Sequence, residues 1–222
     1  MDPRVTELIV VRHGETEWNA DERIQGHIDV ELNDIGKEQA TLVASRIAKD
    51  FEISAVYSSG LKRASATAEA IAQRCGIPEV FKDPNLRERN LGILQGLRLR
   101  EVAQLHPTAY HAFLSRKTNQ ELPGGGESID QLFERCTSCI EKIAENHRGE
   151  QVVIVSHGGT IRQLYRRAMP TASLRGKVLN ASISIFHISS DDIWTLESWV
   201  DVAHLTDKTL LQSGFGGGAT SG

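Results

Sequence analysis

The sequence has few of the features that mark secreted, membrane-bound or nucleic-acid-binding proteins. Its 222 residues include only three cysteines, an odd number that does not support a disulfide framework. The formal net charge is −4, which gives no sign of a nucleic-acid partner or of an anionic membrane. No apolar run approaches the roughly 20 residues that span a bilayer. The chain enters a predicted strand a few residues after Met1, which leaves no room for a targeting segment, so we expect a cytoplasmic protein.

The cysteines do not predict a metal site either. Cys136 and Cys139 have the spacing of half a zinc motif, but no second cysteine and histidine cluster supplies the remaining ligands. The apolar residues around them recur at helical spacing, at Ile129, Leu132, Phe133, Ile140 and Ile143. We therefore expect Cys136 to pack in the core from a helix, with Cys139 close to the same face.

The composition and the order of the elements predict one α/β domain. A hydrophobic content of 40% over this length is enough for a single well-filled core. Strand and helix signals alternate, which predicts a three-layer α/β/α sandwich with a mostly parallel central sheet over residues 1–212. The expected strands are 7–11, 55–57, 151–155, 182–188 and 194–200, with an apolar segment at 78–81, and the expected helices are 35–49, 62–74, 98–105, 108–115, 127–147 and 159–168. The glycine-rich tail 213–222 has nothing to bury and is expected to be disordered.

Two β-branched runs end in similar motifs. Residues 8–11 are followed by Arg12-His13-Gly14, and residues 152–155 by Ser156-His157-Gly158. Such runs are typical of buried strands in parallel sheets, where ligands bind beyond the carboxyl ends of the strands. We therefore expect both histidines at one edge of the sheet, with Arg12 as a permanent cation beside them. Gly14 is expected to let the backbone turn and approach a ligand closely.

A third segment supplies another cation. Ser58-Ser59 is expected to cap an alanine-rich helix, which places Arg63 in or near its first turn. The free N–H groups and the dipole at that end of a helix favour anions. Because guanidinium groups match phosphate oxygens in a bidentate manner, Arg12 and Arg63 together predict a phosphate clamp.

Together, the motifs resemble those of the histidine phosphatase superfamily, which includes the cofactor-dependent phosphoglycerate mutases and many phosphatases. The resemblance runs from about Leu8 to Ser182, and the combination is highly specific. The motifs that carry it are Arg12-His13-Gly14-Glu15-Thr16, Gln25-Gly26-x-x-Asp29, Leu32-Asn33, Gly36, Ser58-Ser59-x-Leu61-x-Arg63-Ala64-x-x-Thr67-Ala68, the block Leu86–Gly92, and Ser156-His157-Gly158.

The resemblance implies a phosphoglycerate mutase-like fold and roles for individual residues. His13 would attack phosphorus and form a phosphohistidine, while Arg12, Arg63 and His157 would offset the phosphate charge with neither a metal nor a cofactor. Glu88 would protonate the leaving oxygen and then act as the base for water. Glu15 and Glu17 are expected to orient the loop that carries them. The expected substrate contacts are Arg12, Gly14, Asn19, Gln25, Gly26, Arg63, Glu88, His157 and Gly158.

The same phosphohistidine can serve hydrolysis or transfer to a second acid. Leu91 stands where mutases carry a substrate-contacting tyrosine, and Leu99 where they carry a lysine. The short span between Glu88 and His157, with Leu122–Ser128 in place of a basic lid, resembles the phosphatase members. We therefore predict hydrolysis of small phosphomonoesters, with phosphoglycerate mutase activity as the alternative. An inactive module that binds phosphorylated ligands is a further alternative, although all five catalytic candidates are present.

Cations outside the clamp favour a substrate that carries a carboxylate, such as phosphoserine or a sugar-acid phosphate. These cations are Arg98, Arg100, Arg116 and Lys117. The oligomeric state is open, and a homodimer is one of the alternatives.

Overall fold

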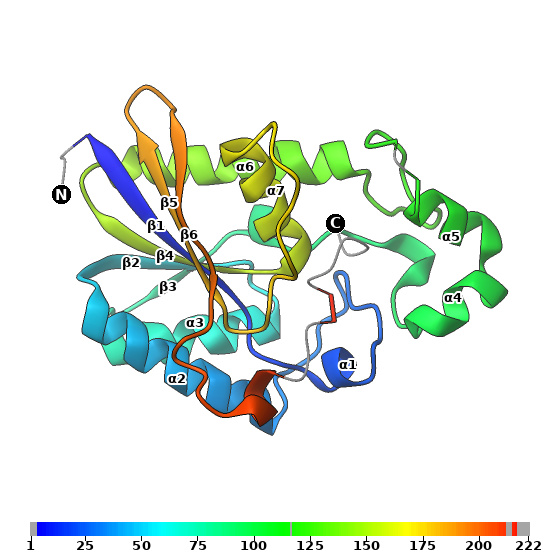
Figure 1. Ribbon diagram of the computed structural model, residues 1–222, viewed down its shortest axis with the longest axis horizontal. Helices are drawn as coiled ribbons and strands as arrows, with labels where there is room; N and C mark the ends of the chain where they lie inside the picture. The colour runs from blue at the N-terminus through cyan, green and yellow to red at the C-terminus, as the bar shows by residue number, and fades with distance from the viewer. Residues whose placement is uncertain (1–3, 116, 212–214, 217–222) are drawn as a thin grey trace.

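The computed structural model shows a single mixed sheet flanked by helices (Figure 1). It describes residues 4–115, 117–211 and 215–216. The strand order is β3-β2-β4-β1-β5-β6, with β3, β2, β4 and β1 parallel and the last two strands antiparallel to their neighbours. The strands are β1 (Val5–Arg12), β2 (Ile53–Ser58), β3 (Val80–Lys82), β4 (Gln151–Ser156), β5 (Ile183–Ser189) and β6 (Trp194–Asp201). The predicted mostly parallel sheet is confirmed.

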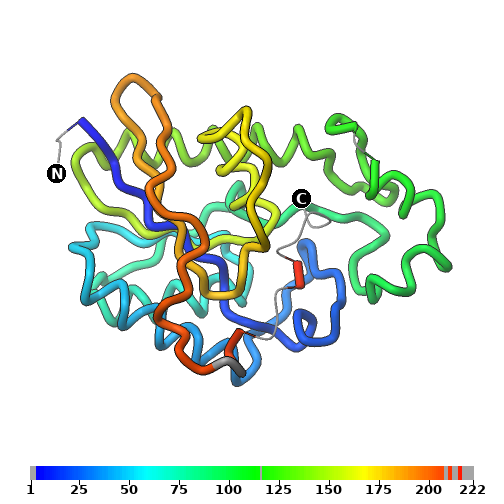
Figure 2. Tube along the Cα trace, in the orientation of Figure 1, coloured from blue at the N-terminus to red at the C-terminus, as the bar shows by residue number. Residues whose placement is uncertain are grey.

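Helices cover both faces of the sheet, which confirms the three-layer architecture. One face carries α2 (Asp34–Asp50) and α3 (Lys62–Cys75), and the other carries α6 (Ile129–Asn146) and α7 (Gly158–Ala168) (Figures 1 and 2). Successive strand residues point to opposite faces, so Ile9 packs with α2 and α3 whereas Leu8 packs with α6 and α7. Because both faces are buried, the central strands carry continuous apolar runs, at 8–11 in β1 and 152–155 in β4, rather than an alternating pattern.

A small lobe lies to one side of the sheet, between β3 and α6 in the chain. It contains α4 (Leu99–Leu105), α5 (Pro107–Phe113) and a short 3₁₀ turn at Gly92–Leu94, and it has its own apolar cluster (Figure 1). Another 3₁₀ turn, at Pro84–Leu86, packs through Leu86 against the main core. A further 3₁₀ turn covers Lys208–Leu211. The four-residue helix α1 (Glu17–Ala20) was not predicted, because it is too short to show a periodic pattern. Thr16 caps it and accepts a hydrogen bond from the Asn19 backbone N–H.

The structure confirms the interpretation of the cysteines and corrects one helix start. Cys136 and Cys139 are buried on α6 against the core, and burial raises the pKa of Cys136 to about 12. The predicted Ser58-Ser59 cap is wrong, because the residue before α3 is Leu61 and makes no side-chain cap. Ser59 instead reaches across the sheet edge to His157.

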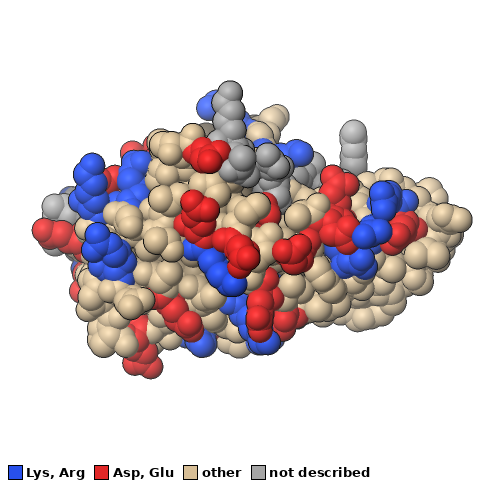
Figure 3. Space-filling model, turned by 90° about the horizontal axis from the view of Figure 1, so that it is seen from below, with Lys and Arg blue, Asp and Glu red and all other residues tan. Residues whose placement is uncertain are grey.

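The outer surface carries charges of both signs. On the side of α2 and α3, basic and acidic side chains are interspersed (Figure 3). Within the described ranges, we find no helix with the length and apolar character that crossing a bilayer requires.

Candidate active site

The two histidines lie together beyond the ends of neighbouring strands. Arg12 of β1 pairs in register with Ser156 of β4, so His13 and His157 follow at the same edge of the sheet. Their ring centroids are 5.1 Å apart, and both side chains are almost fully buried. The parallel strands therefore place these residues as the sequence pattern predicts.

His13 has the protonation pattern that a nucleophile needs. Its Nδ1–H donates to the carbonyl oxygen of Gly14 over 2.7 Å, which leaves the lone pair on Nε2. Burial, and then the charges of Arg63 and Arg12, lower the pKa of His13 well below its usual 6.5. The ring is therefore neutral at neutral pH. Asn180, which was not among the predicted site residues, donates through Nδ2 to the His13 carbonyl oxygen over 3.0 Å.

His157 is also held neutral, and one of its nitrogens is free to contact a ligand. Its Nε2 pairs with Oγ of Ser59 over 2.7 Å. Its Nδ1 is buried and has no hydrogen-bond partner in the part of the chain that is described. Burial, followed by the charge of Arg63, lowers the pKa of His157 well below 6.5. Ser59 is thus a site residue that sequence reasoning placed in the right segment but in the wrong role.

Arg12 and Arg63 form a buried pair of cations. Each is 1% exposed, and burial lowers the pKa of each to about 10, so both remain charged at neutral pH. Among the described residues, neither forms an ion pair with a carboxylate, and neither Nε–H has a hydrogen-bond partner. Nη1 and Nη2 of Arg63 donate to the carbonyl oxygens of Ile28 and Gly26, respectively. Two desolvated cations with unused donors suit an anion, because a buried charge is costly unless it is paired.

Glu88 lies at the same pocket with its carboxyl group oriented by backbone amides. Oε1 accepts from the N–H of Arg89 over 2.8 Å, and Oε2 accepts from the N–H of Gly159, in the first turn of α7, over 3.0 Å. Burial raises the pKa of Glu88 above its usual 4.5, more than the amides and arginines lower it. A raised pKa favours the protonated form, which suits a group that donates a proton to a leaving oxygen.

The loop that follows β1 lines the pocket at two residues, and its other polar side chains bind protein groups. Gln25 and Gly26 line the pocket, and Thr16 donates to Oε1 of Gln25. Glu15 accepts from the Asn33 amide over 2.8 Å, which agrees with its expected orienting role.

Gly14 is required by a close approach between protein segments. A Cβ there would lie 2.4 Å from the carbonyl oxygen of Gly36, so the residue lets this loop pack against α2. The predicted approach of Gly14 to a ligand stays a prediction. Gly158 is the first residue of α7 and follows His157 directly.

The pocket above the phosphate site has an apolar wall. It is lined by Ile24, Leu91, Leu99, Phe113 and Phe215, with Arg23 as the additional cation. The predicted disordered tail lies largely outside the described residues, but Phe215 and Gly216 are described. The carbonyl oxygen of Phe215 accepts from Nη2 of Arg12 over 2.6 Å and from Nδ2 of Asn19 over 2.9 Å.

Of the four cations expected to bind a substrate carboxylate, Arg98, Arg100 and Lys117 do not line this pocket. Arg98 pairs with Asp21 over 2.6 Å, and Arg98 and Arg100 line a separate hollow beside α1. Lys117 is exposed, and Arg116 lies outside the described residues. The expectation that Arg98 and Arg100 line the pocket is wrong, because Arg98 pairs with Asp21 and both arginines line the neighbouring hollow. In the described part of the chain, we also find no cluster of three histidine, cysteine or carboxylate groups arranged to hold a metal ion.

Comparisons with known proteins agree with this geometry. The model of the histidine phosphatase superfamily (branch 1) matches residues 8–202. The chain is 52% identical to "Phosphoglycerate mutase-like protein 4" of Arabidopsis thaliana, covering 100% of this chain and 96% of the relative. It is 49% identical to the "Metal-independent phosphoserine phosphatase" of the same plant, covering 99% and 91%. The structure superposes on a phosphoserine phosphatase mutant from Entamoeba histolytica in complex with phosphoserine with a TM-score of 0.76, at 29% identity, covering 90% of this chain and 99% of that one.

Proposed function

Because the chain belongs to the histidine phosphatase superfamily, we propose that it hydrolyses small phosphomonoesters through a phosphohistidine on His13. The observation that carries this proposal is the neutral, correctly tautomeric His13 beside two buried guanidinium groups with unused N–H donors. A 49% identical relative is named a metal-independent phosphoserine phosphatase, which supports a site that works with protein cations alone.

The chemistry proceeds in two displacements. In the first, Nε2 of His13 attacks phosphorus, the bond from phosphorus to the ester oxygen breaks, and Glu88 gives its proton to that oxygen. In the second, water attacks the phosphohistidine, Glu88 takes a proton from the water, and inorganic phosphate leaves with His13 restored. The Nε–H groups of Arg12 and Arg63, together with His157, stabilise the charge on the equatorial oxygens in both steps.

For the substrate, we propose a small phosphorylated metabolite with a carboxylate, such as phosphoserine or a sugar-acid phosphate. The name of the phosphoserine phosphatase relative supports this class. Arg23 lines the upper pocket and is the cation we propose for the carboxylate, in place of Arg98 and Arg100. It already pairs with Asp21 over 3.0 Å and donates to the Gly96 carbonyl oxygen, so a substrate carboxylate would share it with Asp21. Phosphoserine turnover that depends on Arg23, with a neutral alkyl phosphate unaffected by Arg23→Met, is the expected result.

Transfer to a second acid is the competing function, because one relative is named mutase-like. A mutase holds a second phosphorylated acid above the phosphohistidine, which calls for cations there. The groups above His13 are mainly apolar, with Leu91 and Leu99 at two positions where the mutases carry polar residues. The pocket therefore favours hydrolysis.

The test is phosphate release from an aryl phosphate and from phosphoserine in the presence of EDTA. We expect release by the wild type, a histidine-linked phosphoenzyme trapped by rapid denaturation, and loss of both in His13→Ala. A phosphoenzyme that accumulates and discharges only when 3-phosphoglycerate is added would establish the mutase instead. Binding of phosphate esters with no phosphoenzyme at all would leave the binding module.

A further inference from the structure

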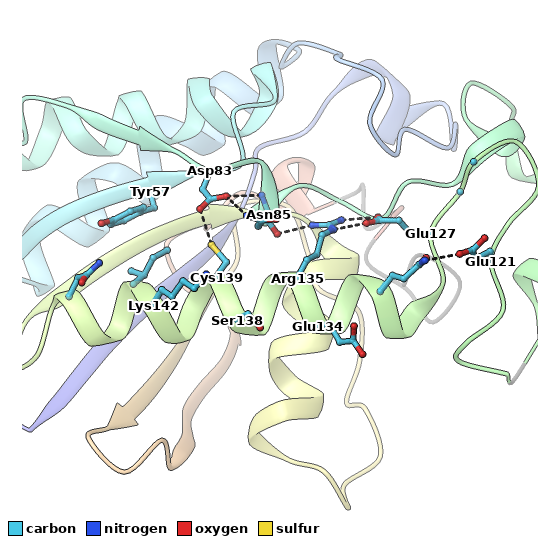
Figure 4. Close-up of a pocket in the computed structure, with 15 residues that line it drawn as sticks. Tyr57, Asp83, Asn85, Glu121, Glu127, Glu134, Arg135, Ser138, Cys139 and Lys142 are labelled. Atoms are coloured by element: carbon cyan, nitrogen blue, oxygen red, sulfur yellow. Dashed lines mark hydrogen bonds and ion pairs between the residues drawn. The ribbon is translucent and has the colours of Figure 1, made fainter.

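A groove beside α6 contains an arginine, Arg135, whose five N–H donors all bind Glu127 or the segment that carries Glu88. Arg135 projects from α6 toward Glu127 and Asn85 (Figure 4). Its Nε and one N–H of Nη2 bind the two carboxylate oxygens of Glu127 over 2.6 and 2.9 Å. The remaining N–H groups donate to backbone carbonyl oxygens, those of Asn85 and Arg87 from Nη1 and that of Glu88 from Nη2, over 2.7 to 2.8 Å. All five donors of the guanidinium are therefore satisfied.

Glu127 fixes the other side of the same segment. Its Oε2 accepts from the N–H of Asn90 over 2.7 Å, and its backbone N–H donates to the Asn90 carbonyl oxygen over 2.8 Å. The side chains of Arg135 and Glu127 are only 18% and 20% exposed, so the pair is largely shielded from water. Arg135 and Glu127 thus hold the chain on both sides of the Glu88 side chain. Arg135 binds the carbonyl oxygen of Glu88, and Glu127 binds Asn90, two residues later.

This bracketing matters because residues 87–91 belong to no helix or strand. A 3₁₀ turn ends at Leu86 and the next begins at Gly92. The position of the backbone that carries Glu88 therefore depends on side-chain donors, since the segment has no backbone ladder of its own, while the carboxyl group itself is oriented by the amides of Arg89 and Gly159. Ser156 and Thr160 hold the carbonyl oxygens of Leu86 and Arg87 from the sheet side. The Glu88 carbonyl oxygen is shared by Arg135 and by Nε2 of His27, over 2.8 and 2.7 Å.

We propose that Arg135, braced by Glu127, is a positioning residue that sets the Glu88 carboxyl against the leaving oxygen. The proposal rests on the proposed function, because it gives Arg135 a role only in the step where Glu88 donates a proton. Arg135 itself touches neither the phosphate site nor its cations. Its loss displaces the acid and leaves His13, Arg12 and Arg63 in place.

The leaving group separates this role from a general structural one. An alkoxide, as in phosphoserine, is a strong base and must be protonated as it leaves, whereas p-nitrophenolate leaves without a proton. The value of kcat/KM reports the steps up to release of the alcohol or phenol, so slow hydrolysis of the phosphohistidine does not enter it. The ratio of kcat/KM for the two substrates is also independent of how much of the enzyme is folded, because the enzyme concentration cancels.

The experiment compares kcat/KM for phosphoserine and p-nitrophenyl phosphate in Arg135→Met, Arg135→Lys and Glu88→Gln. Complete loss of a general acid is worth about 10²–10⁴-fold, so we expect Glu88→Gln to lower the phosphoserine to p-nitrophenyl phosphate ratio by that factor. Arg135→Met should lower the ratio by about tenfold or more, with p-nitrophenyl phosphate nearly unchanged. Arg135→Lys should behave like the methionine variant, because lysine keeps the charge but lacks the planar set of five donors. Lys142→Met, which removes a cation two turns further along the same groove, should leave the ratio at the wild-type value.

The double variant Glu88→Gln/Arg135→Met closes the test. If Arg135 acts through Glu88, the double variant has the ratio of Glu88→Gln alone. An equal loss on both substrates, a ratio reduced by less than about fivefold in Arg135→Met, or a further drop in the double variant would overturn the proposal. A wild-type protein that cleaves neither substrate would instead refute the proposed function.

Discussion

Removal of residues 213–222 should tighten the binding of phosphate. In the structure, the Phe215 carbonyl oxygen occupies Nη2 of Arg12 and Nδ2 of Asn19. With Phe215 and Gly216 in place, the pocket offers about 40 Å³ to the centres of water molecules, which is room for a few waters but not for a phosphate ester. A phosphate that takes the Arg12 guanidinium must therefore displace this carbonyl.

The size of the effect follows from the bonds that are exchanged. A hydrogen bond to a charged group contributes about 1.5–3 kcal/mol and one to a neutral amide about 0.5–1.5 kcal/mol. Ordering the two residues Phe215 and Gly216 opposes this by about 2–3 kcal/mol of conformational entropy. Burial of part of the Phe215 ring stabilises the closed state, in which the Phe215 carbonyl oxygen binds Arg12. The closed tail is then favoured by about 1–2 kcal/mol. We expect substrate to bind only when these Phe215 contacts are broken, so that KM is raised by the same factor, about 5–30-fold.

The assay is steady-state kinetics on an aryl phosphate, with inorganic phosphate as a competitive inhibitor. We expect removal of residues 213–222 to lower both KM and the inhibition constant by about 5–30-fold, with kcat within about twofold. A chain lacking only residues 217–222 keeps Phe215 and Gly216 and serves as the matched control, with constants near those of the full chain. An unchanged or higher KM in the shorter chain would refute the reasoning, since the tail would then be helping to build the pocket.

Two further predictions concern the buried charges. Arg63→Lys should lower kcat/KM by about 10²–10³-fold in steady-state assays, because one ammonium group cannot hold two loop carbonyls and also stabilise the phosphate oxygens; a loss below about tenfold would contradict this. Because the pKa values of His13 and His157 are lowered in the folded state, both contribute to the free energy of unfolding above about pH 6.5. That contribution is lost as the pH falls below about 6.5, by at most about 1.4 kcal/mol per pH unit for each histidine. Urea unfolding at about pH 7 and about pH 5 should show this slope, a variant with both histidines changed to asparagine should flatten it, and the exposed His111→Asn should not.

The strand-end half of the site could be predicted from the sequence because few arrangements satisfy it. Runs such as residues 8–11 and 152–155 must be buried on both faces, and parallel pairing then brings the residues after each run to one edge of the sheet. The position of Arg63 followed from the start of a helix in the same way. These placements depend on local pattern and on one topological rule.

The remaining contacts depend on partners that are distant in the sequence. Ser59 has the chemistry of a helix cap, but its hydroxyl pairs with a histidine 98 residues away. Arg98 has the chemistry of a carboxylate ligand, but an aspartate 77 residues away binds it first. Neither periodicity nor spacing in the sequence predicts such pairs. Each polar side chain could bind several chemically equivalent partners, and tertiary packing selects among them.

Glu88 shows how the two halves of the site divide the chemistry. The nucleophile and the cations are fixed by the sheet and by α3, so their geometry comes with the fold. The acid comes from an irregular segment whose position depends on donors from α6, β4 and α7. If the proposed role of Arg135 holds, a change in those donors alters proton donation without disturbing the phosphate site, and the preference for leaving groups can be adjusted from outside the pocket. We would then expect one phosphate clamp to serve esters of different alcohols, because the charge on the phosphate is the same in all of them and only the demand for a proton differs.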